Sequence, residues 1–115
     1  MPKIGPEDTF EIVYWASDVE QSMGSVPVTK HARKVFSLVA VHHTPNATGW
    51  FALRKYSAAG ALERENRYVL GAFDILDLTN PIDSPLLTFE AGREMRIISG
   101  APTSIQVTLS VYDIG

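Results

Sequence analysis

The chain has 115 residues, 45% of them hydrophobic and 20% charged, which is enough for one globular domain with its own core. Its formal net charge of −3 lacks the basic excess of a phosphate-binding surface and argues against nucleic acid as the main partner. The absence of cysteine excludes disulfide bonds and thiolate chemistry, and it favours a cytosolic origin. We also expect no signal peptide, because the N-terminus has no apolar h-region, and no membrane span, because no apolar run approaches roughly 20 residues.

The N-terminal part of the chain predicts an arm, a strand and a long connection. Residues 1–8 contain two prolines, and we expect them to form an extended arm ahead of a single β-sandwich domain over residues 9–115. Residues 9–16 (TFEIVYWA) are rich in β-branched and aromatic side chains and predict the first strand. Residues 17–33 predict a connection with one short helical turn near residues 18–23, ended by Gly24 and Pro27.

The middle of the chain predicts a central strand followed by a hairpin. Residues 34–44 are the most hydrophobic stretch and are apolar on both faces, which is typical of a strand covered on both sides. A dense turn signal at residues 44–49 predicts that residues 50–56 return as the second strand of the hairpin. Residues 57–66 have helix propensity but are too few for an independent helix, so we expect a loop or one helical turn.

The last part of the chain predicts four more strands. Residues 67–75 form one, with Gly71 as a candidate bulge, and residues 76–84 form a loop. Residues 85–91 and 93–99 predict two strands, and residues 104–114 alternate apolar and polar side chains as a half-buried strand does. Six to eight short strands without strand–helix alternation predict an all-β fold, an antiparallel β-sandwich of jelly-roll type.

No catalytic motif accompanies these strands. His42 and His43 are adjacent on a predicted strand and point to opposite faces, so they do not easily share a metal ion with His31. There is no nucleophile elbow, dinucleotide fingerprint or P-loop. Turn chemistry explains a group of loop carboxylates without EF-hand spacing: Asp74, Asp77 and Asp83. We therefore expect no enzyme activity, no metal ion and no cofactor.

The C-terminal third shows a family resemblance. It carries FEAGREMRI at residues 89–97, SGAPTS at residues 99–104 and then the alternating last strand. This arrangement is similar to that of small jelly-roll or β-sandwich structural proteins of tailed-phage virions, in which a Gly-rich turn precedes a C-terminal strand. The resemblance implies a virion protein made in the host cytoplasm, a homo-oligomer and often a trimer, attached to a larger protein shell.

The first functional hypothesis is a non-enzymatic capsid decoration (cement) protein that binds and stabilises a phage shell by burying apolar surface. The alternative is a carbohydrate-binding or receptor-binding module, lectin-like or from a tail fibre, that uses Trp15 or Trp50 with loop Asp and Asn residues. A third hypothesis, a cupin-like enzyme, would need the histidines and a carboxylate around one metal ion. The predicted contact residues are Ile4, Pro6, Phe10, Trp15, Trp50, Leu76, Leu78 and Ile82.

Overall fold

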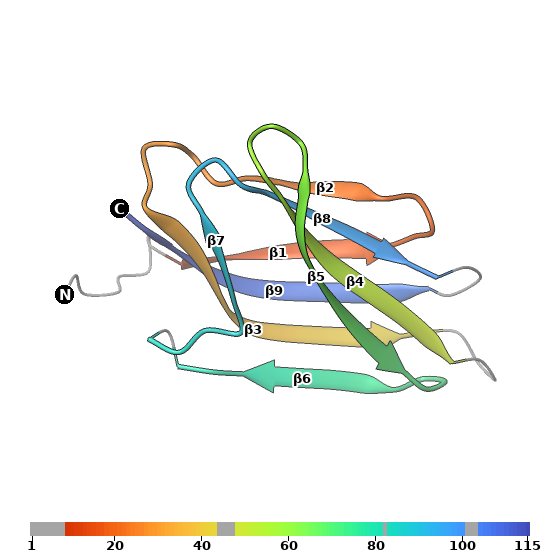
Figure 1. Cartoon of the computed structure of the whole chain (residues 1–115). Coiled ribbons are helices and arrows are strands. Elements are labelled where there is room, and N and C mark those ends of the chain that lie inside the picture. Colours follow the sequence, from red (N-terminus) through yellow and green to blue (C-terminus); the bar gives the residue numbers. More distant parts are fainter. Residues whose placement is uncertain (1–8, 44–47, 82, 101–103) are drawn as a thin grey trace.

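The computed structural model describes residues 9–43, 48–81, 83–100 and 104–115, and these form an all-β sandwich (Figure 1). No helix in this part of the chain is long and apolar enough to cross a bilayer. The strands in the described residues are β1 (Thr9–Ala16), β2 (Gln21–Ser25), β3 (Ala32–His42), β4 (Gly49–Tyr56), β5 (Leu62–Leu70), β6 (Ile75–Thr79), β7 (Leu87–Glu90), β8 (Glu94–Ser99) and β9 (Ile105–Ile114).

The strands form two antiparallel sheets in jelly-roll order. Sheet A has the order β1-β9-β3-β6, with β7 also paired to β3, and sheet B has the order β2-β8-β4-β5. β6 and β7 lie end to end along β3, because β6 pairs with its residues 37–41 and β7 with its residues 32–35. The nine strands of the described chain therefore fill eight sheet positions, four in each layer, which is the double-sheet arrangement of a jelly roll.

The core lies between the two sheets and follows from strand alternation. The four apolar residues of β9 from Ile105 to Val111 are fully buried, and the polar residues between them are only partly buried. From sheet B, Phe51 is fully buried and stacks on Tyr68 with 5.1 Å between the ring centroids. One face of each sheet is thus committed to the core, and the two outer faces remain for other contacts.

The predicted fold class is confirmed, and several strands match their predicted positions. β1 covers residues 9–16 as predicted, and β9 begins within one residue of its predicted start. β7 and β8 lie within the two strands predicted around residue 92. Gly92 has a φ of +80°, a conformation that glycine adopts at little cost, and this explains the turn between them.

Some local predictions are wrong. The strand count is nine in the described residues, above the predicted six to eight. Residues 17–33 contain β2 in place of a helical turn, and the predicted loop at residues 76–84 contains most of β6. Both strands have only five residues, too few for their alternation to stand out against turn-forming neighbours.

The predicted hairpin of residues 34–56 is also wrong. β3 belongs to sheet A and β4 to sheet B, so the chain passes from one layer to the other between His42 and Gly49. The hairpin partner of β4 is β5, which begins at Leu62, inside the segment predicted as a loop or helical turn. β5 is an edge strand whose first residues are exposed, so its Glu and Arg residues give the local sequence a helical character.

Candidate interaction surfaces

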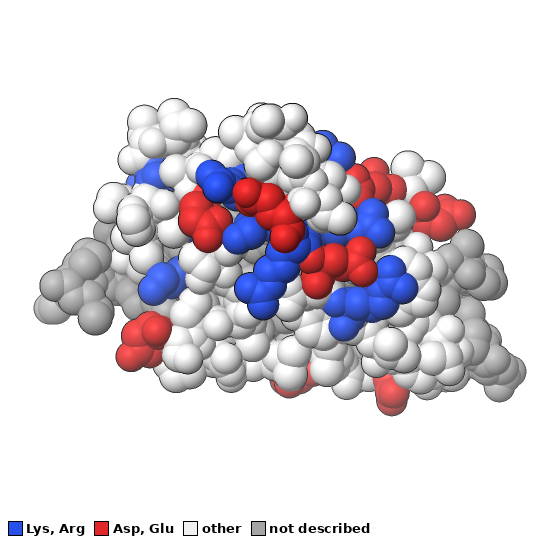
Figure 2. All heavy atoms as spheres, viewed as in Figure 1, with Lys and Arg blue, Asp and Glu red and all other residues white. Residues whose placement is uncertain are grey.

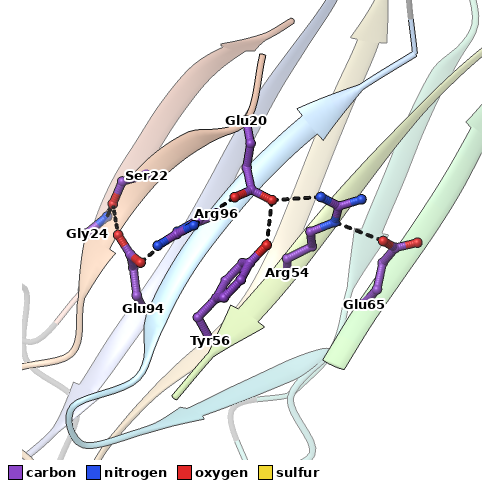
Figure 3. Close-up of polar contacts among 8 residues, drawn as sticks. All are labelled: Glu20, Ser22, Gly24, Arg54, Tyr56, Glu65, Glu94 and Arg96. Atoms are coloured by element: carbon purple, nitrogen blue, oxygen red, sulfur yellow. Dashed lines mark hydrogen bonds and ion pairs between the residues drawn. The ribbon is translucent and has the colours of Figure 1, made fainter. Parts of the chain in front are cut away.

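The outer face of sheet B carries a network of ion pairs centred on Glu20, and Figure 2 shows acidic and basic side chains interleaved over this face. Glu20 precedes β2 and accepts hydrogen bonds from Arg54 Nη1 at 2.7 Å, Tyr56 Oη at 2.7 Å and Arg96 Nη1 at 2.9 Å (Figure 3). Arg54 and Tyr56 come from β4 and Arg96 from β8, where alternate residues point outward. One carboxylate therefore ties the connection before β2 to two neighbouring strands.

The network extends to both sides of Glu20. Arg54 Nε donates to Glu65 of β5 at 2.9 Å, and Arg96 Nε donates to Glu94 at 2.7 Å. Ser22 of β2 donates to the other oxygen of Glu94 at 2.7 Å. The polar contacts thus cross all four strands of sheet B, as Figure 3 shows.

The electrostatics of Glu20 suit a structural role. Burial alone would raise the pKa of Glu20, but hydrogen bonds from Arg96, Arg54 and Tyr56 outweigh burial and lower it to about 2. The pKa of Tyr56 is raised, chiefly because its hydroxyl donates a hydrogen bond to the Glu20 carboxylate. A carboxylate that stays ionised and already accepts three hydrogen bonds is a poor general base.

The other two carboxylates of the network behave in the same way. The hydrogen bond from Arg54 lowers the pKa of Glu65, and the hydrogen bond from Ser22 lowers the pKa of Glu94. General acid catalysis by a carboxyl group needs a raised pKa, and all three network carboxylates are shifted the opposite way. The ion-pair network links neighbouring strands of sheet B, and its carboxylates do not form an acid–base pair.

Trp50 is enclosed on the same outer face. The guanidinium carbon of Arg67 lies 3.8 Å from the centroid of the Trp50 ring, within the range of a cation–π contact. The indole also lies against Gly100, where an added Cβ would overlap its nitrogen. One face of this ring is therefore unavailable as a stacking platform for a sugar.

The outer face of sheet A carries a row of four uncharged side chains, three apolar and one a glutamine, which we call the apolar row. Trp15, Gln106, Val41 and Ile75 are successive cross-strand partners, so their side chains follow one another across β1, β9, β3 and β6. Trp15 is 52% exposed and Ile75 is 67% exposed. None of these four side chains is charged, in contrast to the outer face of sheet B.

The three histidines lie apart. His43 lies at the end of the apolar row, where its ring centroid is 4.9 Å from that of Trp15. His42 is fully buried, and its Nδ1 lies 2.8 Å from the carbonyl oxygen of Gly71. His31 precedes β3 at its opposite end, where its backbone N–H donates to Ile114. The described residues contain no group of three or more His, Asp or Glu side chains suited to hold a metal ion.

A strained turn lies beside the apolar row. Residues 71–74 form a turn in which Gly71 N donates to the carboxylate of Asp74 at 2.9 Å. His42 fixes this turn to the end of β3, because its backbone N–H donates to the carbonyl oxygen of Asp74 at 2.9 Å. Phe73 has a φ of +56°, which is rare for a bulky residue, and its side chain is 64% exposed. Strain that presents an exposed aromatic residue favours a binding role for this turn.

We expect Phe73→Gly to raise the free energy of unfolding by about 1 kcal/mol, because glycine adopts this φ without strain and little packing is lost. Phe73→Ala, which shortens the side chain and keeps the strain, is the control and should give no such gain. Urea denaturation of both variants measures the difference. A loss of stability in Phe73→Gly would show that the exposed ring stabilises the fold.

The structure distributes the predicted contact residues over several surfaces. Trp15 lies on the outer face of sheet A and Trp50 on that of sheet B. Phe10 is 40% exposed at the edge of the sandwich, where the guanidinium group of Arg33 lies 4.9 Å from its ring centroid. Leu76 and Leu78 point inward, opposite buried residues of β3. The others lie outside the described residues: Ile4, Pro6 and Ile82.

Comparisons with known proteins give structural likeness but no family. No family model and no curated protein matches the chain. A chain of the disulfide-linked pili of Bacillus endospore appendages is 12% identical with a TM-score of 0.47, covering 94% of this chain and 87% of that one. PirA is 12% identical with a TM-score of 0.46, covering 96% and 97%. A chain of the IBDV viral particle is 11% identical with a TM-score of 0.47, covering 99% of this chain but 35% of that one. At these scores the functional argument depends on the chain's own surfaces.

Proposed function

We propose that this chain is a non-enzymatic structural protein that docks onto a larger protein assembly through the apolar row of sheet A. The contrast between the two outer faces carries the proposal. Sheet B presents charges that are paired with one another, whereas the apolar row leaves Trp15 and Ile75 more than half exposed. An exposed apolar patch with polar surroundings marks a protein interaction site, and the row offers no cation to a phosphate group.

The row is suited to a tight contact because its side chains stand on paired strands. Trp15 and Ile75 lie on β1 and β6, and Val41 lies between those strands on β3. Side chains held on a rigid sheet lose less conformational entropy on binding than side chains on a loop. A tryptophan at such a position is typical of the few residues that dominate binding energy.

Within this class we propose a capsid decoration protein that binds and stabilises a phage shell as part of the virion and associates with its own copies. Jelly-roll topology supports this proposal, because the architecture is common in capsid proteins. The resemblance of the C-terminal third to small virion proteins of tailed phages supports it as well.

A carbohydrate-binding or receptor-binding module is the second candidate, and it rests on the exposed ring of Trp15. Trp50 contributes less to this candidate, because Arg67 covers one face of its ring. Quenching of tryptophan fluorescence by sugars, absent in Trp15→Phe, would favour the module over the decoration protein.

We expect Trp15→Ala and Ile75→Ala each to weaken shell binding at least about tenfold, because they remove the two exposed ends of the apolar row. Co-sedimentation with intact heads of the phage that, under this proposal, encodes the chain measures binding. Circular dichroism verifies that both variants are folded. Val69→Ala is the matched control, since Val69 is 67% exposed but lies opposite Trp50 in sheet B. Wild-type binding by both row variants would contradict the proposed docking surface.

A further inference from the structure

We infer that β1 is a pairing edge at which two copies of this chain join their sheets into one. β1 is the terminal strand of sheet A and pairs only with β9 in the described chain. The free side of an edge strand presents backbone donors and acceptors that invite another strand. Soluble proteins guard such edges with charges, prolines, bulges or short strands, so an edge without these features needs an explanation.

The other sheet edges carry features that hinder pairing with another strand, and β1 carries few of them. β2 has five residues and a register shift between Ser22 and Ser25. β5 has nine residues, but four of the five side chains at positions 63–67 are charged. β6 and β7 have five and four residues. β1 has eight residues with Glu11 as the single charge, which makes it the least protected edge of the described sandwich.

The side chains of β1 indicate which strand fits beside it. On the inner face Phe10 is 40% exposed, and Ile12 and Tyr14 pack against the core while staying partly buried. On the outer face Val13 is 51% exposed and Trp15 is 52% exposed. A strand that covers both faces must itself be apolar on both faces. β1 of a second copy has this pattern and the same free edge, so the strand is complementary to itself.

Symmetry restricts how two copies of β1 pair. A two-fold axis perpendicular to the sheet keeps both interiors on the same side, and inward residues then pair with inward residues. Such an axis passes beside one residue of the strand, and pairing over nearly the whole of Thr9–Ala16 places it at Ile12 or Val13. Glu11 would face Val13 or Trp15 of the second copy and never a second Glu11, so like charges are not brought together.

The inference rests on the proposed function in one respect, namely that the protein works together with its own copies. It replaces the trimer implied by the resemblance with a two-fold dimer. Val13 lies on β1 and Ile75 on β6, with two strands between them, so dimer formation and shell docking can be tested separately. A wild-type dimer that fails to bind heads would contradict the docking proposal and leave the dimer standing.

Light scattering coupled to gel filtration tests the inference. The wild-type protein should have twice the chain mass of 12.7 kDa. Val13→Lys places a charge in the middle of the edge and should raise the dissociation constant of the dimer at least about tenfold. Ile75→Lys is the matched control and should remain dimeric, with both variants folded by circular dichroism. A monomeric wild-type protein, or a Val13→Lys dimer as tight as wild type, would overturn the inference.

Cysteine cross-linking then determines the register, because the chain contains no native cysteine. Val13→Cys should form a disulfide-linked dimer under mild oxidation if the axis passes through Val13. A mixture of Glu11→Cys and Val13→Cys chains should cross-link if the axis passes through Ile12. Val69→Cys, on the outer face of the other sheet, is the control for random collision. No cross-link above this control in either arrangement would overturn antiparallel pairing of β1.

Discussion

Replacing Phe51 by alanine should lower the free energy of unfolding by about 4 kcal/mol. The Phe51 side chain is fully buried between the sheets and stacks on Tyr68 at 5.1 Å. The variant loses the burial of the ring and leaves a cavity that rigid strands on both sides cannot close. Since small domains have only about 5–15 kcal/mol of stability, the loss should be evident as a lower urea midpoint.

Two further variants make this prediction specific. Phe73→Ala is the same chemical change at a site that is 64% exposed, and it should alter stability by less than about 0.5 kcal/mol. Phe51→Leu retains much of the side-chain volume and should lose about 1 kcal/mol. If Phe51→Ala and Phe73→Ala lost equal stability, Phe51 would not lie at the centre of the core.

Replacing Glu20 by glutamine should lower the free energy of unfolding by about 2 kcal/mol at neutral pH. Glutamine keeps the shape of the side chain but removes the charge that holds Arg54 and Arg96 beside each other. The side chains of Glu20 and Arg54 are 20% and 22% exposed, so water compensates this loss only in part. Chemical denaturation with urea at low salt measures the change.

The matched control is Glu63→Gln. Glu63 pairs with Arg93 at 3.0 Å, and the two side chains are 32% and 34% exposed. Solvent screens this contact, so the variant should change stability by less than about 0.5 kcal/mol. A similar loss in both variants would show that the Glu20 network contributes no more to stability than a solvent-exposed ion pair.

The same network predicts sensitivity to acid. The pKa of Glu20 in the folded protein is about 2, below its ordinary value of 4.5, so the stabilisation is complete above pH 4.5. It is lost as the pH falls from 4.5 towards 2, because the carboxylate becomes protonated in the unfolded chain first. The stability of Glu20→Gln should therefore fall less steeply than that of wild type over this interval, and equal slopes would contradict the assigned pKa.

Strands were predictable where one face is buried and the other is polar. In β9 every second side chain from Ile105 to Val111 is fully buried, so the period of two is visible in the sequence. β5 lacks this contrast, because charged side chains occupy both of its faces near residue 64. Contacts such as that between Arg54 and Glu65 form only once sheet B assembles. They therefore cannot be predicted from the strand propensity of the local sequence.

Less of the candidate surfaces could be predicted. Trp15 was accessible to sequence reasoning as an aromatic residue on a largely apolar strand, and the structure places it on an open face. Glu20 meets Arg54 and Arg96 across 34 and 76 residues of sequence, so no local motif indicates their network. The positive φ of Phe73 has no sequence signal, because glycine or asparagine is the usual sign of that conformation.

The position of β9 between β1 and β3 has a consequence for biosynthesis. Both neighbours pair with β9, so no strand links β1 to β3 until Ile105–Ile114 has been made. A nascent chain on the ribosome therefore carries a vacant slot with an unpaired edge on either side. The β9 segment of another chain fits that slot as well as its own does, so crowded synthesis favours chains that exchange their last strand.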